Sequence, residues 1–303
     1  MRSKERIAGL FVLFFLAQRI LVFGGSTDDV NSLFDQWAKA RQAHSTAINS
    51  PRTTADIDLD YGSRLLELAK KFDTNSDVYA QALIFAIDVD TDGAAGDQAS
   101  ELLARDCINN KRLENFFNSG PHPKDAAAEN LFQTIAQKSA IRAYRGQATK
   151  ILADLFKDSK PEEAEKLYEQ VIEKYADVKS FEDSRQKLGP QAQGGLFYVQ
   201  NLAVGKVAPD FSGEDVNGAT IKLSDYRNKV VVICFCSESC APCRQLYPYW
   251  RSLEERMKGK PFALIGINPD SKAELLKAAQ REKFTWPVLW DHGDADTLLR
   301  AIP

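Results

Sequence analysis

The chain has 303 residues, of which 44% are hydrophobic and 27% are charged, and its 39 lysines and arginines nearly balance its 42 aspartates and glutamates. Because a domain typically holds about 100 to 150 residues, this length predicts two domains with a sizeable core. The balanced charge provides no basic excess to attract a phosphate backbone, so nucleic acid is excluded as an expected partner.

Residues 1–25 have the pattern of an export signal. Arg2, Lys4 and Arg6 precede an apolar run from Ile7 to Ala17, which is shorter than the ~20 residues that cross a bilayer. We therefore expect an exported, periplasmic chain whose residues 1–25 are either cleaved as a signal peptide or kept as a membrane anchor. A buried N-terminal helix is the weaker alternative. Disulfides can persist in the oxidising surroundings of an exported protein.

Residues 26–202 show helical periodicity almost throughout. Apolar side chains recur at spacings of three and four residues, for example at Val30, Leu33, Phe34 and Trp37, and again at Leu131, Phe132, Ile135 and Ala136. The first domain is therefore expected to be α-helical.

One segment of this region, PEEAEKLYEQVIEKYADVKSF at residues 161–181, is similar to a helix of a tetratricopeptide-type hairpin. It begins with proline and carries an apolar stripe of Ala164, Leu167, Tyr168, Val171 and Ile172. No convincing second copy occurs ~34 residues away, so the pattern favours an irregular bundle or solenoid over true repeats. The helical domain can be a surface for docking partners or a structural spacer, and both interpretations stay open.

The periodicity changes near Val204, where strand patterns begin. Asn217-Gly218 is a strong hairpin signal, and the apolar run from Val230 to Cys236 predicts a strand buried on both faces. We therefore place a domain boundary after residue 202 and expect an α/β domain in residues 203–303.

Helices and strands are expected to alternate after this first buried strand. The pattern predicts a helix from Ala241 to Met257 and a second buried strand from Phe262 to Asn268. Ser271 and Glu274 form a capping box for the next helix, and Trp286 to Trp290 can form another strand. Strands separated by helices imply parallel pairing.

Cys240 and Cys243 lie where the first buried strand gives way to a helix. On a first helical turn their side chains face the same way, so their sulfurs can form a disulfide. The helix N-terminus stabilises a thiolate on Cys240 and so lowers its pKa. We therefore expect Cys240 to attack a substrate disulfide and Cys243 to resolve the mixed disulfide. Pro242 is tolerated in this first turn and stiffens the ring that the disulfide closes.

Three alternatives compete with redox exchange. A zinc site could use Cys234 and Cys236 with Cys240 and Cys243, but the first two would have to leave the sheet. A purely structural disulfide with this spacing constrains the unfolded chain little. A peroxide-reducing cysteine could use Ser237 as part of its pocket, yet a lone reactive thiol has no use for a second cysteine three residues on. Cys234 and Cys236 are expected to be small buried hydrophobes.

The C-terminal half resembles the TlpA-like group of exported thioredoxin-fold redoxins over about 100 residues. The residues that carry the resemblance are Gly205 to Phe211, Leu223 to Lys229, Val230 to Phe235, Cys240 to Arg244, and Pro248. The helical region more weakly resembles the long N-terminal segments of planctomycete-type bacterial proteins, through Arg145 to Ala148 and the helix from Leu167 to Asp177.

This resemblance implies a thioredoxin-like fold and an enzyme that exchanges thiols and disulfides with protein substrates and with a redox partner protein. It implies the same roles for Cys240 and Cys243, with no cofactor and no metal. A thiol peroxidase of the AhpC/TSA type is the alternative within the same fold. The alternative of another class is a binding scaffold, in which the helical domain docks a partner and the redoxin domain is vestigial.

The sequence departs from the family pattern close to the two cysteines. Cys236 and Ser239 stand where the family commonly has tryptophans, and Cys234 stands where thioredoxins proper often bury a carboxylate. The acceptor for the proton of the resolving cysteine is therefore unassigned. Glu238 is as consistent with a solvated loop residue as with a base.

The sequence also departs from the family at its end. A thioredoxin-like sheet is expected to continue past Pro303 with a cis-proline loop, two strands and a helix. The domain of residues 203–303 is therefore expected to be truncated, so that the chain is a fragment, the domain is unstable, or a partner completes it.

Overall fold

The computed structural model of the chain describes residues 28–46, 53–118 and 126–291. It divides into two compact units, Met1–Lys206 and Val207–Pro303. The expected export signal at residues 1–25 and the expected chain end at Pro303 both lie outside the described residues. No helix of the described part is long and apolar enough to cross a membrane.

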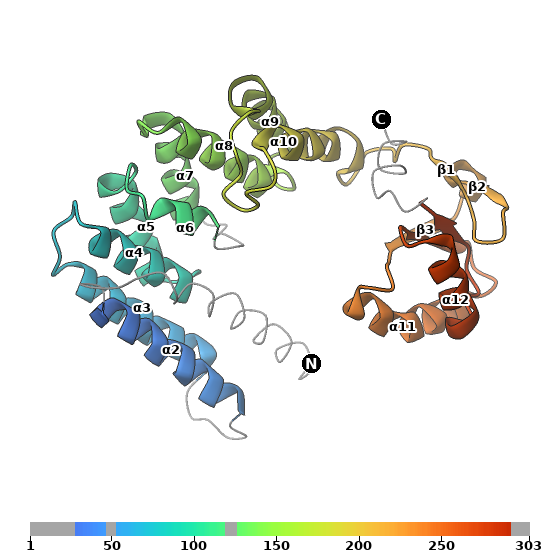
Figure 1. Cartoon of the computed structure of the whole chain (residues 1–303), viewed down its shortest axis with the longest axis horizontal. Coiled ribbons are helices and arrows are strands. Elements are labelled where there is room, and N and C mark those ends of the chain that lie inside the picture. The colour runs from blue at the N-terminus through green and yellow to red at the C-terminus, as the bar shows by residue number, and fades with distance from the viewer. Residues whose placement is uncertain (1–27, 47–52, 119–125, 292–303) are drawn as a thin grey trace. The chain divides into compact units, whose positions relative to one another are not determined.

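The first unit is an array of helices, as predicted (Figure 1). Its helices are α2 (Asp28–Thr46), α3 (Thr54–Ala69), α4 (Asp77–Val89), α5 (Ala94–Asp106), α6 (Leu113–Phe117), α7 (Ala126–Lys138), α8 (Arg142–Phe156), α9 (Pro161–Tyr175) and α10 (Leu188–Phe197), with a π-helical turn η2 (Tyr198–Leu202). Most of the extensive helix contacts join neighbours along the chain, such as α3 with α4, α7 with α8, and α8 with α9. One continuous apolar core runs through the array.

The helix α9 shows how this packing follows from the sequence. Proline stands in its first turn, as predicted, and Ala164, Tyr168 and Val171 from the predicted stripe are buried. Its partner α8 approaches closely at Gly146, where an added Cβ would lie 2.9 Å from the Cβ of Tyr175 on α9. A glycine is required here because the helix surfaces touch.

Two glycine-to-alanine changes, one at this contact and one away from it, should change the free energy of unfolding in opposite directions. Gly146→Ala should lower the free energy of unfolding by about 1–3 kcal/mol, because the new methyl group overpacks against Tyr175. Gly194→Ala in α10 meets nothing within 4 Å, so it should raise the stability by up to about 1 kcal/mol through helix propensity alone. Urea unfolding followed by circular dichroism at 222 nm would measure both, and equal effects of the two changes would contradict the packing argument.

The second unit is an α/β fold with a parallel sheet, which confirms the predicted fold class. Its elements are β1 (Ser212–Glu214), β2 (Thr220–Lys222), the 3-10 turn η3 (Leu223–Tyr226), β3 (Val230–Phe235), α11 (Ala241–Met257), β4 (Phe262–Asn268), α12 (Lys272–Glu282) and β5 (Val288–Trp290). The described sheet has the order β3-β4-β5 with parallel pairing, and β1 and β2 form a separate antiparallel hairpin. Gly218 turns this hairpin at a φ of 89°, as the Asn217-Gly218 signal predicted.

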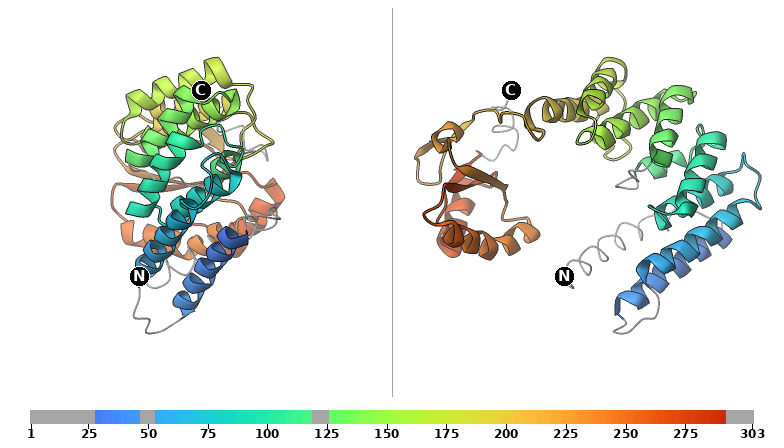
Figure 2. Two further views of the ribbon diagram at one scale, coloured as in Figure 1. Left: turned by 90° about the vertical axis from the view of Figure 1, so that its left-hand side faces the viewer. Right: turned by 180° about the vertical axis from the view of Figure 1, so that it is seen from behind.

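The two faces of the sheet are covered differently (Figures 1 and 2). The helices α11 and α12 both cover one face, where Tyr247 and Leu275 pack with Cys234 of β3 and Leu264 of β4. The hairpin and η3 contribute to the cover of the other face, where Ile221, Leu223 and Tyr226 pack near Ile265, Ile267 and Leu289. The strand period of two therefore sends alternate residues into two different cores.

The prediction that the Val230–Cys236 run is buried on both faces is confirmed only in part, because Val232 and Cys234 pack on one face and Val231 and Ile233 on the other, but only Cys234 is buried. β3 pairs only with β4 among the described strands, so it lies at an edge of the sheet that these residues form. Val230 is 64% exposed and Phe235 is 58% exposed, while Cys234 is buried. An apolar run indicates a strand, but the neighbours of that strand decide how much of it is covered.

Candidate active site

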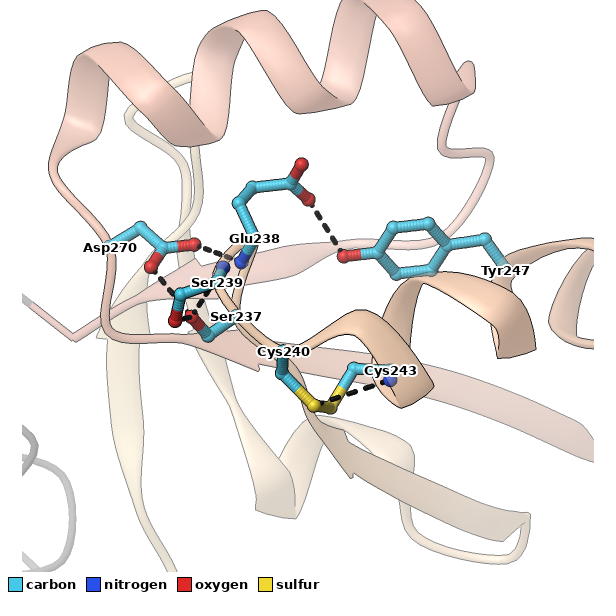
Figure 3. The surroundings of a disulfide bond; sticks show 7 residues. All are labelled: Ser237, Glu238, Ser239, Cys240, Cys243, Tyr247 and Asp270. Carbon is cyan, nitrogen blue, oxygen red and sulfur yellow. Dashed lines mark hydrogen bonds between the residues drawn. A yellow bond between two sulfur atoms is a disulfide. The ribbon is translucent and has the colours of Figure 1, made fainter. Parts of the chain in front are cut away.

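Cys240 and Cys243 are joined by a disulfide at the start of α11 (Figure 3). Their Cα atoms lie 5.3 Å apart, and both residues are partly exposed. The carboxyl end of β3 lies five residues before Cys240, so the disulfide sits at the junction of sheet and helix. The two cysteines that the sequence analysis singled out are therefore brought together, and solvent can reach them.

Cys240 occupies the N-cap position of α11. Its backbone is extended, and its sulfur accepts a hydrogen bond from the Cys243 backbone N–H at 3.2 Å. Pro242 stands in the first turn, where the missing N–H leaves no helical hydrogen bond unmade. The first N–H groups of a helix lack partners within the helix and carry partial positive charge. This geometry can therefore stabilise negative charge on the Cys240 sulfur once the disulfide is reduced.

The segment between β3 and Cys240 is held by a carboxylate from the segment that follows β4. Asp270 follows β4, and its two oxygens accept hydrogen bonds from the Ser237 hydroxyl at 2.9 Å and from the Glu238 backbone N–H at 2.7 Å (Figure 3). The Ser239 N–H in turn donates to the Ser237 oxygen at 3.2 Å. The turn before the disulfide is therefore fixed by side chains as well as by its own backbone.

Glu238 is neither the solvated loop residue nor the free base that the sequence left open. Its carboxylate accepts a hydrogen bond from the Tyr247 hydroxyl at 2.9 Å and forms an ion pair with Arg281 of α12. Its side chain is only 17% exposed, and in Figure 3 it points away from the disulfide. Burial and then this hydrogen bond raise the pKa of Tyr247, so the phenol remains a donor. Glu238 therefore ties the turn to α11 and α12.

Cys234 and Cys236 pack on the α11 side of the sheet, in the same apolar cluster as Tyr247. A hydrogen bond between their thiols, followed by burial, raises the pKa of Cys234, and the same bond lowers the pKa of Cys236. The proton therefore stays on the buried Cys234 thiol while Cys236, which is partly exposed, ionises first. The sequence prediction of two inert small hydrophobes is confirmed for the burial of Cys234 but misses this asymmetry.

The remaining predictions for this region concern metals and peroxide. Among the described residues, no group of three or more histidine, cysteine, aspartate or glutamate side chains could hold a metal ion. The Ser237 hydroxyl, considered for a peroxide pocket, donates to Asp270 instead. Three contributors were missed altogether, namely Asp270, Tyr247 and Arg281. The one available signal was that Asp270 follows a strand expected to run parallel to β3, which places both strand ends at one edge of the sheet.

The free cysteines should differ in reactivity, because the pKa of Cys236 is lowered while those of Cys234 and Cys107 are raised. In the native protein with its disulfide intact, iodoacetamide near neutral pH should modify Cys236 before Cys234 or Cys107, because only a thiolate attacks and burial raises the pKa of Cys107 to about 12. Cys234→Ala should slow the modification of Cys236 by removing the hydrogen bond. Peptide mass spectrometry over time measures the order, and earlier labelling of Cys107 would contradict it.

Comparison with known proteins identifies the family of the second unit. A profile described as the AhpC/TSA family matches residues 204–301, which include both cysteines and the whole described sheet. The C-terminal unit is an AhpC/TSA-family domain. This assignment confirms the resemblance to thioredoxin-fold redoxins, and the structure shows the helical region that the sequence predicted in front of it.

Relatives of this AhpC/TSA domain are named as thiol-disulfide oxidoreductases. The chain is 35% identical over 94 residues to the thiol-disulfide oxidoreductase ResA of Geobacillus kaustophilus, which covers 31% of this chain and 54% of the relative. It is 29% identical over 93 residues to ResA of Bacillus subtilis, which covers 30% of this chain and 52% of the relative. The chain thus spans about half the length of these relatives.

Solved structures also match part of the chain. The thioredoxin domain of a thiol-disulfide oxidoreductase from Bacteroides vulgatus is 29% identical, with 33% of this chain and 74% of that chain covered and a TM-score of 0.31. A thioredoxin-like protein from Bacteroides caccae is 16% identical, with 68% of this chain and 80% of that chain covered and a TM-score of 0.36.

Proposed function

We propose that the chain is a thiol-disulfide oxidoreductase that exchanges its Cys240/Cys243 pair with thiols and disulfides of protein substrates. The observation that carries this proposal is the disulfide at the N-terminus of α11, with the Cys240 sulfur in the cap position. The names of the relatives that match the AhpC/TSA domain support the same reaction class.

The reduction of a substrate disulfide proceeds in two exchanges. The Cys240 thiolate attacks one substrate sulfur, a Cys240–substrate disulfide forms, and the other substrate sulfur leaves as a thiolate that takes up a proton. The Cys243 thiol then loses its proton and attacks the Cys240 sulfur, which releases the second substrate thiolate. Two electrons pass to the substrate, and the chain is left with the Cys240–Cys243 disulfide. A redox partner protein reverses these steps to restore the dithiol.

The helix start supports different roles for the two cysteines. Cys240 caps the helix and receives the Cys243 N–H bond, so its thiolate is the one that the helix stabilises. Cys243 lies within the first helical turn, where its sulfur is held next to the sulfur it must attack. Local concentration then drives the second exchange, since the resolving thiol needs no diffusion to reach the mixed disulfide.

Trapping tests the two roles directly. Cys243→Ser should accumulate mixed disulfides between Cys240 and protein substrates, because the second exchange cannot occur, whereas Cys240→Ser should accumulate almost none. Both variants are compared in a Cys236→Ser background, so that the other reactive thiol adds no adducts. Non-reducing gels followed by mass spectrometry measure the adducts, and equal trapping by both variants would refute the assigned roles.

We further propose that the reaction takes place outside the cytoplasm, on the basis of the basic and then apolar pattern of residues 1–25. When residues 1–27 are fused to a reporter enzyme that is active only after export, the fusion should be active in a Gram-negative host. Deletion of residues 7–17 should abolish that activity. Fractionation then distinguishes a cleaved signal, which leaves a soluble reporter, from a tether, which leaves it on membranes. An inactive intact fusion would refute export.

The two alternatives remain weaker. A thiol peroxidase of the AhpC/TSA type is consistent with the family name, yet the Ser237 hydroxyl proton is committed to Asp270 and is not available to a peroxide. A scaffold with a vestigial redoxin domain would leave the Cys240–Cys243 pair without exchange partners. Consumption of added peroxide by the Cys243→Ser chain would support the first alternative. Absence of all adducts in the trapping experiment would support the second.

A further inference from the structure

We propose that Asp270 is a positioning residue for the Cys240–Cys243 centre. Its carboxylate holds the turn of residues 237–239, and that turn keeps the Cys240 sulfur in the cap of α11. The inference rests on the proposed function for its catalytic meaning, because only a reacting Cys240 gains from a fixed cap. Asp270 does not touch the sulfurs, so its effect passes through the turn.

The hydrogen bonds of the turn have a defined direction. An ionised carboxylate only accepts, so the single Ser237 hydroxyl proton must point to Asp270. The 2.7 Å contact between the Ser237 and Ser239 hydroxyl oxygens is then donated by Ser239. The Ser239 backbone N–H donates to the same Ser237 oxygen. Asp270 thereby orients the Ser237 hydroxyl, whose oxygen accepts two hydrogen bonds from Ser239.

The turn is hydrogen-bonded to Cys240, which carries the reacting sulfur. The Cys240 backbone N–H donates to the Ser237 carbonyl oxygen at 3.1 Å, and the Arg244 N–H donates to the Cys240 carbonyl oxygen at 3.2 Å. Cys240 is therefore held by the turn on one side and by the helix on the other. If the turn moves, the Cys240 sulfur moves relative to the Cys243 N–H that it accepts.

Asp270 is itself held in place by two hydrogen bonds. Its backbone N–H donates to the side-chain oxygen of Asn268 at 2.8 Å, and Asn268 is only 2% exposed at the end of β4. The Asp270 carbonyl oxygen accepts a hydrogen bond from the indole N–H of Trp290 at 2.9 Å, at the end of β5. The clamp on the turn thus starts from the ends of two paired strands, where Asn268 of β4 lies opposite Trp290 of β5.

In the reduced protein, the position of the turn affects how much of Cys240 is thiolate. With the turn held, the Cys240 thiolate keeps the Cys243 N–H and the helix N-terminus within reach. With the turn free, the sulfur spends less time in the cap, and a smaller fraction of Cys240 is thiolate at neutral pH. The alkylation rate of reduced Cys240 at pH 7 should then fall roughly threefold to tenfold, less than complete loss of a hydrogen bond to a charged group would give, because the contact is populated for less time and is not abolished.

Four variants of the full chain separate position from charge. Asp270→Ala removes both acceptors, and Ser237→Ala removes the hydroxyl that Asp270 orients. Ser237→Thr keeps that hydroxyl. Asp270→Asn removes the charge but can keep both contacts, since its oxygen accepts from the Glu238 N–H while its amide donates to Ser237, whose own proton then turns to Ser239. Asp210→Ala is the control, because Asp210 accepts from the Ser224 N–H at 2.9 Å in the same unit, outside this network.

The measurement is the iodoacetamide rate of reduced Cys240 as a function of pH, followed by peptide mass spectrometry in the Cys236→Ser background. Asp270→Ala and Ser237→Ala should move the midpoint of the profile to higher pH while the limiting rate at high pH stays unchanged. The asparagine, threonine and Asp210→Ala variants should stay close to the parent chain. Loss of fold would instead raise the reactivity of Cys107 and Cys234, so the same spectra reveal it.

Two outcomes would overturn the inference. An unchanged profile for both Asp270→Ala and Ser237→Ala would show that the turn does not need the clamp. An asparagine profile equal to the alanine profile would show that charge, and not position, is what Asp270 contributes. The proposed function is tested separately by substrate trapping on the Cys243→Ser chain with Asp270 unchanged. Trapping without a profile shift refutes only the positioning role, and a profile shift without trapping refutes only the reaction.

Discussion

The hydrogen bond from the Cys243 N–H to the Cys240 sulfur exists because α11 begins immediately after Cys240. A helix that began one turn earlier would satisfy that N–H internally and would bring the sulfur out of the cap. The position of this start depends on β3, which must end five residues before, and on a turn that reverses direction in between. The chemistry proposed for the disulfide is therefore set by where a strand ends and a helix begins.

Two carboxylates near this junction have structural tasks that can be distinguished by their partners. Asp270 binds the backbone and the first side chain of the turn, whereas the carboxylate of Glu238 reaches outward to Tyr247 and Arg281. The first set of contacts ties the turn to the sheet, and the second ties it to both helices that cover the sheet. Arg281 is about half exposed, so its ion pair contributes less than the buried hydrogen bond from Tyr247. Neither carboxylate faces the sulfurs as a base.

The sequence predicted the local features of this site, since they depend on neighbouring residues. The limits of α11 and β4 and the Ser271–Glu274 capping box follow from spacing and are confirmed. The clamp by Asp270 joins residues more than thirty positions apart, and the one signal was that both segments follow parallel strands, which places them at the same edge of the sheet without indicating the contact. The exposure of Phe235 was equally beyond reach, because apolar character identifies a strand without identifying its neighbours.

Cys234 of β3 and the nearby Cys236 limit the path of the proton that Cys243 would lose in the proposed second exchange. Cys234 stands where the resemblance suggested a carboxylate, but its thiol is buried, hydrogen-bonded to Cys236 and raised in pKa, so it holds its own proton at neutral pH. It cannot serve as the base. The thiolate that the substrate releases in the first exchange has an ordinary pKa near 8.5 and is produced close to Cys243. Proton transfer from Cys243 to that leaving thiolate needs no further group from the described part of the chain, and it makes resolution depend on the substrate that has just been attacked.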